Sequence, residues 1–122
     1  ATGIDIDPKA EDIARENAAY NGFAAPEFTA LTGNVTEDTA LMESLAAKEY
    51  DLVLVNIVAD VIIGLSPILK HFLNAGSTLI CSGILDSRLE DVLAALDRGG
   101  LEVTGIKEKE DWRCVRAKRR TV

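Results

Sequence analysis

Hydrophobic residues in this sequence fall into short continuous runs, separated by longer stretches in which they recur every three or four positions. The strongest run, residues 52–55, consists of apolar side chains, half of them β-branched, and it is too short for a helix. Runs of this kind are typical of strands that are buried on both faces of a parallel sheet. Asn56 follows directly. Because sheets disfavour asparagine, we expect the strand to end there.

The same alternation extends along most of the chain. It predicts further strands at residues 2–6, 28–31 and 78–81, and helical segments at residues 37–48, 57–74 and 86–98. Asp7 and Pro8 start a helix after the first strand, since aspartate is a favoured N-cap and proline is favoured at the first helical position. Gly22 is a suitable left-handed cap at the end of that helix.

The pattern changes after Gly99 and Gly100, which end the last helical segment. An apolar stretch that begins at Leu101 leads into a charged turn at residues 107–111, and residues 112–118 run back. This is typical of an antiparallel hairpin. The chain is therefore expected to form a single domain, residues 1–122, with an open, mostly parallel α/β sheet that ends in an antiparallel hairpin.

Composition narrows the class of protein. A 122-residue chain with 48% hydrophobic and 27% charged residues is ordinary for one soluble domain, and no apolar run approaches the length of a membrane span. The net charge of −7 argues against non-specific binding to nucleic acid. Cys81 and Cys114 show no C-x-x-C spacing, and we expect reduced core residues of a cytoplasmic protein. Trp112 is also expected to pack in the core.

Two polar sites at strand ends are candidates for chemistry. Asp5 is placed to accept hydrogen bonds from both hydroxyls of a ribose, although a divalent metal bound by Asp5 and Asp7 is an alternative, and Asp7 is also explained as a helix cap alone. Asn56 is explained either as the N-cap of the following helix, the commoner role for asparagine, or as a functional amide at the strand end. No G-x-G motif for a phosphate is present.

Several segments together resemble a known family. Residues 3–8, 15–18 and 21–22 look like the second strand and following helix of a class I methyltransferase, and the segments at residues 56–59, 82–85 and 110–112 narrow the likeness. Together they resemble the methyltransferase of ribosomal protein L-eleven, the PrmA family. The resemblance implies a Rossmann-like, three-layer α/β/α sheet that uses S-adenosylmethionine to methylate amino groups, on lysine side chains or the N-terminus, of a large-subunit ribosomal protein.

The resemblance also implies roles for individual residues, which come from two places in the chain. Asp5 would bind the ribose hydroxyls of the cofactor and Ile6 would pack on its adenine. Gly33, Asn34 and Val35 would line the adenine pocket, although Asn34 replaces the aspartate that is more usual there.

Asn56 would contact the cofactor and orient the incoming amine. The resemblance implies no metal. It also places the family's first strand, its Gly-rich loop and its substrate-recognition domain before Ala1, so the chain is expected to be a fragment. Two alternatives remain: a catalytically incompetent α/β fragment that acts only as a binding or interaction module, and a nucleotide-dependent oxidoreductase.

Overall fold

The computed structural model describes residues 1–25 and 27–120, which form two compact parts, residues 1–42 and 43–122. Each part is described by itself. Among the described residues, no helix is both long enough and apolar enough to cross a membrane.

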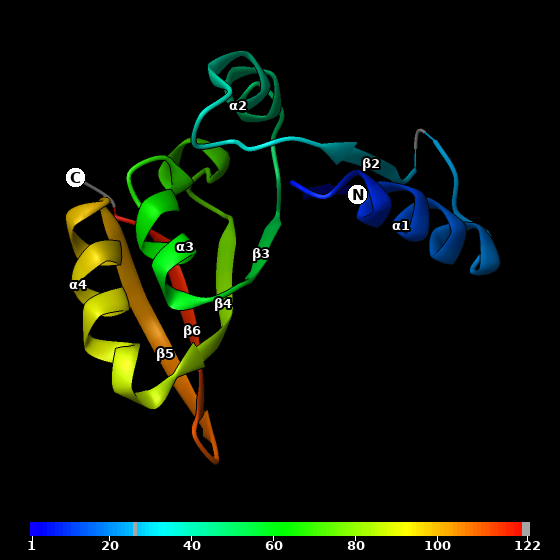
Figure 1. Cartoon of the computed structure of the whole chain (residues 1–122). Coiled ribbons are helices and arrows are strands. Elements are labelled where there is room, and N and C mark those ends of the chain that lie inside the picture. The colour runs from blue at the N-terminus through cyan, green and yellow to red at the C-terminus, as the bar shows by residue number, and fades with distance from the viewer. Residues whose placement is uncertain (26, 121–122) are drawn as a thin grey trace. The chain divides into compact units, whose positions relative to one another are not determined.

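The first part contains one helix and a two-stranded parallel sheet (Figure 1). Strands β1 (Thr2–Asp5) and β2 (Thr29–Thr32) pair in a register that sets Asp5 beside Thr32. Helix α1 (Pro8–Tyr20) begins as predicted, because the Asp7 side chain accepts a 2.9 Å hydrogen bond from the main-chain N–H of Lys9. These elements bring the carboxyl ends of both strands to one edge of the sheet.

The second part is built on a four-stranded sheet with the order β3-β4-β6-β5 (Figure 1). Its strands are β3 (Leu52–Asn56), β4 (Thr78–Leu85), β5 (Leu101–Lys109) and β6 (Trp112–Arg119). Strands β3 and β4 are parallel, whereas β6 is antiparallel to both of its neighbours. The predicted terminal hairpin is therefore confirmed, whereas the sheet that carries it is mixed and not mostly parallel.

The remaining helices are shorter than the hydrophobic pattern indicated. They are α2 (Thr39–Ala46), which crosses the boundary between the parts, α3 (Ala59–Leu65), α4 (Leu89–Arg98) and the 3₁₀ turns η1 (Leu69–Phe72) and η2 (Asp86–Arg88). The long helical segment predicted at residues 57–74 is interrupted near Pro67, which separates α3 from η1. Proline has no N–H to continue a helix, so the break follows from the sequence.

The hydrophobic core of the second part lies between α3, α4 and one face of the sheet. Fully buried residues from all of these elements meet there: Ile62, Leu79, Cys81, Ile84, Val92, Leu96, Leu101 and Val115. Each large aliphatic side chain buried in this way contributes roughly 1.5–3 kcal/mol. This packing fixes the positions of β3 and β4, which carry the residues discussed below.

Three expectations about burial were wrong. Leu52 and Leu54 on β3 are 51% and 66% exposed, so this strand is covered on one face and not on both. Helices α3 and α4 pack on the side of Val53 and Val55. Trp112 is 51% exposed at the start of β6, and does not belong to the core. Cys81 is a buried free thiol as expected, whereas the free thiol of Cys114 is only half-buried.

Candidate functional site

Asp5 ends β1 with its carboxylate exposed. One carboxylate oxygen accepts a 2.9 Å hydrogen bond from the main-chain N–H of Asp7, and within residues 1–25 and 27–120 the other oxygen accepts none. A carboxylate has about four lone-pair sites, so most of its accepting capacity remains available. Ile6, the next residue, is 65% exposed and presents an apolar surface beside that carboxylate.

The loop after β2 meets the same edge of the sheet. The main-chain N–H of Gly33 donates a 2.9 Å hydrogen bond to the main-chain oxygen of Asp5. Asn34 uses its amide oxygen to accept a 3.0 Å hydrogen bond from the N–H of Thr36 and a second bond from the Thr36 hydroxyl. Gly33, Asn34 and Val35 are all half-buried. The first part of the chain therefore gathers five of the six predicted site residues at one strand edge.

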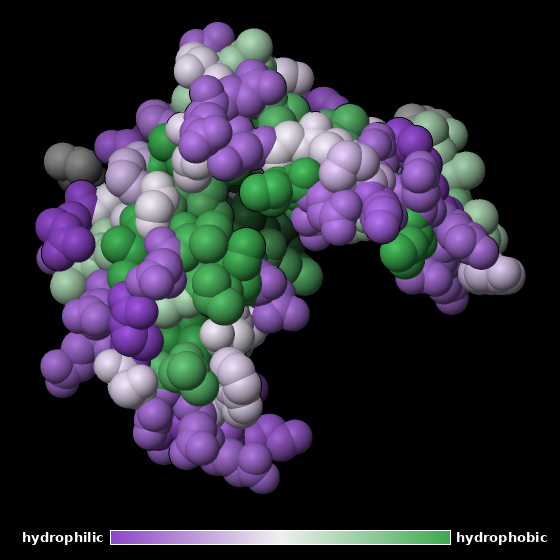
Figure 2. Space-filling view, in the orientation of Figure 1, coloured by the Kyte–Doolittle hydropathy of each residue, from purple (hydrophilic) through white to green (hydrophobic). Residues whose placement is uncertain are grey.

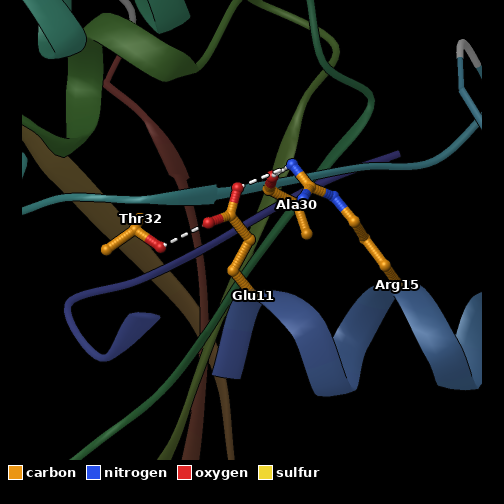
Figure 3. Close-up of polar contacts among 4 residues, drawn as sticks. All are labelled: Glu11, Arg15, Ala30 and Thr32. Atoms are coloured by element: carbon orange, nitrogen blue, oxygen red, sulfur yellow. Dashed lines mark hydrogen bonds and ion pairs between the residues drawn. The ribbon is translucent and has the colours of Figure 1, made fainter. Parts of the chain in front are cut away.

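A cluster of polar side chains links α1 to β2 (Figure 3). This cluster was not predicted from the sequence. The carboxylate of Glu11 accepts a 2.8 Å hydrogen bond from the hydroxyl of Thr32 and forms a 2.6 Å ion pair with Arg15. Arg15 also donates a 3.1 Å hydrogen bond to the main-chain oxygen of Ala30. The spacing of Glu11 and Arg15, one helical turn apart, was a signal for the ion pair, but nothing in the sequence indicated the contact with Thr32.

Asn56 lies in the second part, at the carboxyl end of β3, where it is the register partner of Ser82 on β4. The prediction that Asn56 caps the following helix is wrong. Helix α3 begins at Ala59, and its N-cap is Val58, which makes no side-chain capping bond. In the part of the chain that the structure describes, the Asn56 amide has no hydrogen-bond partner, and its side chain is exposed.

Exposed apolar residues follow Asn56 closely in the chain. Ile57, Val58 and Val61 are 37%, 63% and 39% exposed, and Figure 2 shows hydrophobic side chains gathered over α3 in this part of the molecule. An exposed polar group that makes no hydrogen bond, on a surface that also carries exposed apolar side chains, is available to a ligand. This arrangement at a strand end is typical of ligand-binding sites in open α/β sheets.

The profile of the family described as "Ribosomal protein L11 methyltransferase (PrmA)" matches residues 1–120. The chain belongs to this family. It is 33% identical over 118 residues to a ribosomal protein L11 methyltransferase from Fusobacterium nucleatum, an alignment that includes 97% of this chain but 36% of that relative. The chain thus spans about a third of the length of this curated member of the family.

Solved structures agree with this assignment. A ribosomal protein L11 methylase from Lactobacillus delbrueckii is similar with a TM-score of 0.80 and 25% identity, over 98% of this chain and 57% of that one. An RNA methyltransferase from Salinibacter ruber, solved with S-adenosyl-L-homocysteine, is similar with a TM-score of 0.67 at 20% identity, which shows a common fold. The α/β, Rossmann-like fold expected for a class I methyltransferase is therefore confirmed.

The structure bears on the alternatives for Asp5 and Asp7. Asp7 acts as the N-cap of α1, as one of the sequence-based interpretations proposed. No group of three or more His, Cys, Asp or Glu side chains among the described residues is arranged to hold a metal ion. The carboxylate of Asp5 is the acidic group at this strand edge that a helix cap does not explain.

Proposed function

We propose that this chain is the cofactor-binding and catalytic segment of an S-adenosylmethionine-dependent methyltransferase. It acts in the cytoplasm on amino groups of a large-subunit ribosomal protein, which its relatives' names identify as L11. One observation carries the proposal. At the edge formed by Asp5 and the Gly33–Val35 loop, a carboxylate that can accept further hydrogen bonds lies beside exposed Ile6.

The residues at this edge fit the nucleoside half of S-adenosylmethionine. The unbonded oxygen of Asp5 suits the two hydroxyls of a ribose, since an ionised carboxylate is purely an acceptor. Exposed Ile6 suits one face of an adenine ring. The amide oxygen of Asn34 suits the exocyclic amine of the adenine once the Thr36 hydroxyl gives up its bond to that oxygen. When bound, the cofactor supplies a methyl group activated by its sulfonium.

Asn56 binds and orients the acceptor amine. A free lysine amine has a pKa of about 10.4 and carries a proton at neutral pH, whereas only the neutral amine has the lone pair that methylation needs. The amide oxygen of Asn56 can accept a hydrogen bond from the amine and fix the direction of that lone pair. Once the ammonium has released its proton to water, positioning of this kind can supply much of the rate enhancement.

The test is a methylation assay with the complete open reading frame that carries this chain, S-adenosylmethionine and purified L11. Mass spectrometry of L11 peptides reports which amines gain 14 Da. The proposal predicts methylated lysine side chains or a methylated N-terminus. An intact protein that binds L11 but leaves every amine unmodified would support the alternative, a non-catalytic interaction module.

Asn56→Asp separates the proposed role from any contribution to folding. Aspartate is isosteric with asparagine but adds a charge at the amine site. We expect turnover to fall by at least about tenfold, with the affinity for S-adenosylmethionine changed by less than about twofold. Asn17→Asp on exposed helix α1 is the matched control and should leave turnover unchanged. Normal turnover in Asn56→Asp would remove Asn56 from the mechanism.

A further inference from the structure

Gly83 lies in a β-bulge on β4 that faces the end of β3. From Cys81 to Ile84, β4 advances by three residues while the paired strand β6 advances by two, from Val115 to Arg113. Gly83 occupies this irregularity with φ of 81°, in the left-handed region that glycine adopts without strain. The bulge lies one residue beyond Ser82, the register partner of Asn56.

The bulge brings the backbone of Gly83 against the Asn56 side chain. A Cβ atom on residue 83 would lie 3.1 Å from the amide oxygen of Asn56 and 3.2 Å from the main-chain oxygen of Ile57. Both separations are shorter than ordinary carbon–oxygen contacts. The main chain of Ile57 is held by its 3.3 Å hydrogen bond to the oxygen of Ser82, so the Asn56 side chain is the group that would have to move.

The observed orientation of the Asn56 side chain requires that residue 83 carry no Cβ atom. Its amide makes no hydrogen bond within residues 1–25 and 27–120, and its side chain is exposed, so no polar partner holds it in one rotamer. Gly83, by having no side chain, leaves the space in which the amide oxygen lies. Any other residue at this position would cover that oxygen or turn it away.

We infer that Gly83 is a positioning residue for methyl transfer: by having no side chain, it leaves free the place that the amide oxygen of Asn56 occupies and keeps that oxygen open to the acceptor amine. The inference rests on the role proposed for Asn56. Gly83 itself makes no contact with the reacting atoms in this account. Its contribution is transmitted entirely through the side chain of Asn56.

The test is Gly83→Ala in the complete open reading frame, with Gly100→Ala as a matched control. Gly100 also has φ of 81°, so both changes impose the same left-handed backbone on alanine. The Cβ at residue 100 would meet only the flexible Lys70 side chain, at 3.7 Å. We expect Gly83→Ala to lower kcat by about tenfold to a hundredfold, with KM for S-adenosylmethionine unchanged. Gly100→Ala should leave kcat unchanged, although it should lower the melting temperature of the protein as much as Gly83→Ala does.

A double-mutant cycle distinguishes positioning from a general structural effect. If Gly83 acts through Asn56, then Gly83→Ala should cause no further loss of kcat in an Asn56→Ala background. An equal loss in both backgrounds would overturn the inference, as would an unchanged kcat in Gly83→Ala alongside a strong loss in Asn56→Ala. Unchanged turnover in Asn56→Ala would instead remove the proposed role of Asn56, and this inference with it.

A measurement on the unmutated protein covers the case in which Gly83→Ala does not fold. Three-bond scalar couplings to the β-protons of Asn56 report its χ1 rotamer population by nuclear magnetic resonance. We expect the rotamer that places the amide oxygen beside Gly83 to be the main one. Couplings that show this rotamer to be unpopulated would overturn the inference.

Discussion

The hydroxyl of Thr32 donates a 2.8 Å hydrogen bond to the carboxylate of Glu11, and so links the carboxyl end of β2 to helix α1. Thr32 is also the register partner of Asp5 and the residue before Gly33. This side-chain contact therefore helps to hold the strand end beside Asp5 and the Gly33–Val35 loop, the proposed sites for the ribose and the adenine.

Thr32→Val should destabilise the first part of the chain. Valine keeps the shape of threonine but leaves Glu11 without this donor, and a hydrogen bond of this kind contributes about 0.5–1.5 kcal/mol. The free energy of unfolding, measured with urea, should fall by that amount. Thr2→Val is the matched control on β1, where the described residues offer the hydroxyl no side-chain bond, and it should be nearly neutral. Equal effects from both changes would contradict a specific role for the Glu11 contact.

Asp5→Ala should weaken binding of S-adenosylmethionine by the complete protein. The change removes an acceptor for two charge-assisted hydrogen bonds, each worth roughly 1.5–3 kcal/mol, and since losses are not additive we expect at least a tenfold increase in Kd. Calorimetric titration measures it. Asp12→Ala, an exposed carboxylate on α1, should leave Kd unchanged. Wild-type affinity in Asp5→Ala would mean that another residue holds the ribose.

Local chemistry explains which elements could be predicted from the sequence. Asp7 and Pro8 specify a helix start through contacts within a few residues, and α1 begins where they indicated. The bulge at Gly83 could not be found in this way. A glycine after a buried run is normally taken as the end of a strand, but here the pairing with β6 resumes at Ile84 and extends β4 to Leu85.

The positions of two candidate residues at strand ends, but not their roles, can be compared with the structure. Asp5 and Asn56 both lie at the carboxyl ends of parallel strands, as the predicted strands indicated. The prediction that Asn56 caps a helix was wrong because α3 begins three residues later, at Ala59, with Val58 at the N-cap position. Burial of Leu54 failed because a periodic pattern shows that a residue is apolar, and not whether another element covers it.

Cys81 should be far less reactive than Cys114. Burial in the apolar core raises the pKa of the Cys81 thiol to about 12, with a smaller contribution from Cys114, so almost no thiolate forms near neutral pH. A chromogenic disulfide reagent at pH 8 should modify Cys114 in the native protein, and Cys81 only after unfolding. Peptide mapping identifies the modified residue. Equal rates at both thiols would contradict the burial of Cys81.

The raised pKa of Cys81 also makes the fold less stable as the pH becomes alkaline. Because the folded pKa lies above the ordinary value of 9.0, the folded state retains a proton that the unfolded state releases. The contribution of Cys81 to the free energy of unfolding is therefore complete below pH 9 and is lost as the pH rises toward 12. Wild-type protein should therefore lose more unfolding free energy than Cys81→Ala between pH 8 and pH 10.5. Tyr50, whose pKa burial also raises, is present in both proteins and cancels.

Strand β3 has an edge that could pair with another chain. In the part of the chain that the structure describes, β3 pairs only with β4, and β1 pairs only with β2. Each strand therefore has one edge without a ladder, and on β3 this edge adjoins exposed Leu52 and Leu54. A strand edge with apolar side chains is a template for pairing with another chain. The 122-residue chain by itself should self-associate as its concentration rises, and sedimentation velocity would detect this.

Leu54→Lys tests whether that edge is responsible. A charge on the apolar face should oppose strand addition and shift the chain toward monomer. Ile106→Lys is the matched control: it lies on β5, the strand at the opposite edge of the same sheet, and is 43% exposed, but its neighbours Lys107 and Glu108 are already charged. It should leave self-association unchanged. Equal effects from both substitutions would indicate a general response to charge.

Binding of cofactor by the same chain should be weak or absent. The resemblance assigns the methionine half of S-adenosylmethionine to a Gly-rich loop, and these residues contain no G-x-G motif that could form one. On the proposed assignment, Asp5 and its neighbours would hold only the nucleoside half of the cofactor, without the contacts that would fix its reactive end. The 122-residue chain is first verified by mass spectrometry to begin at Ala1. Calorimetry should then detect no micromolar binding of S-adenosylmethionine, and the methylation assay should detect no turnover. Micromolar affinity would show that the nucleoside contacts suffice, and would make the Gly-rich loop dispensable for binding.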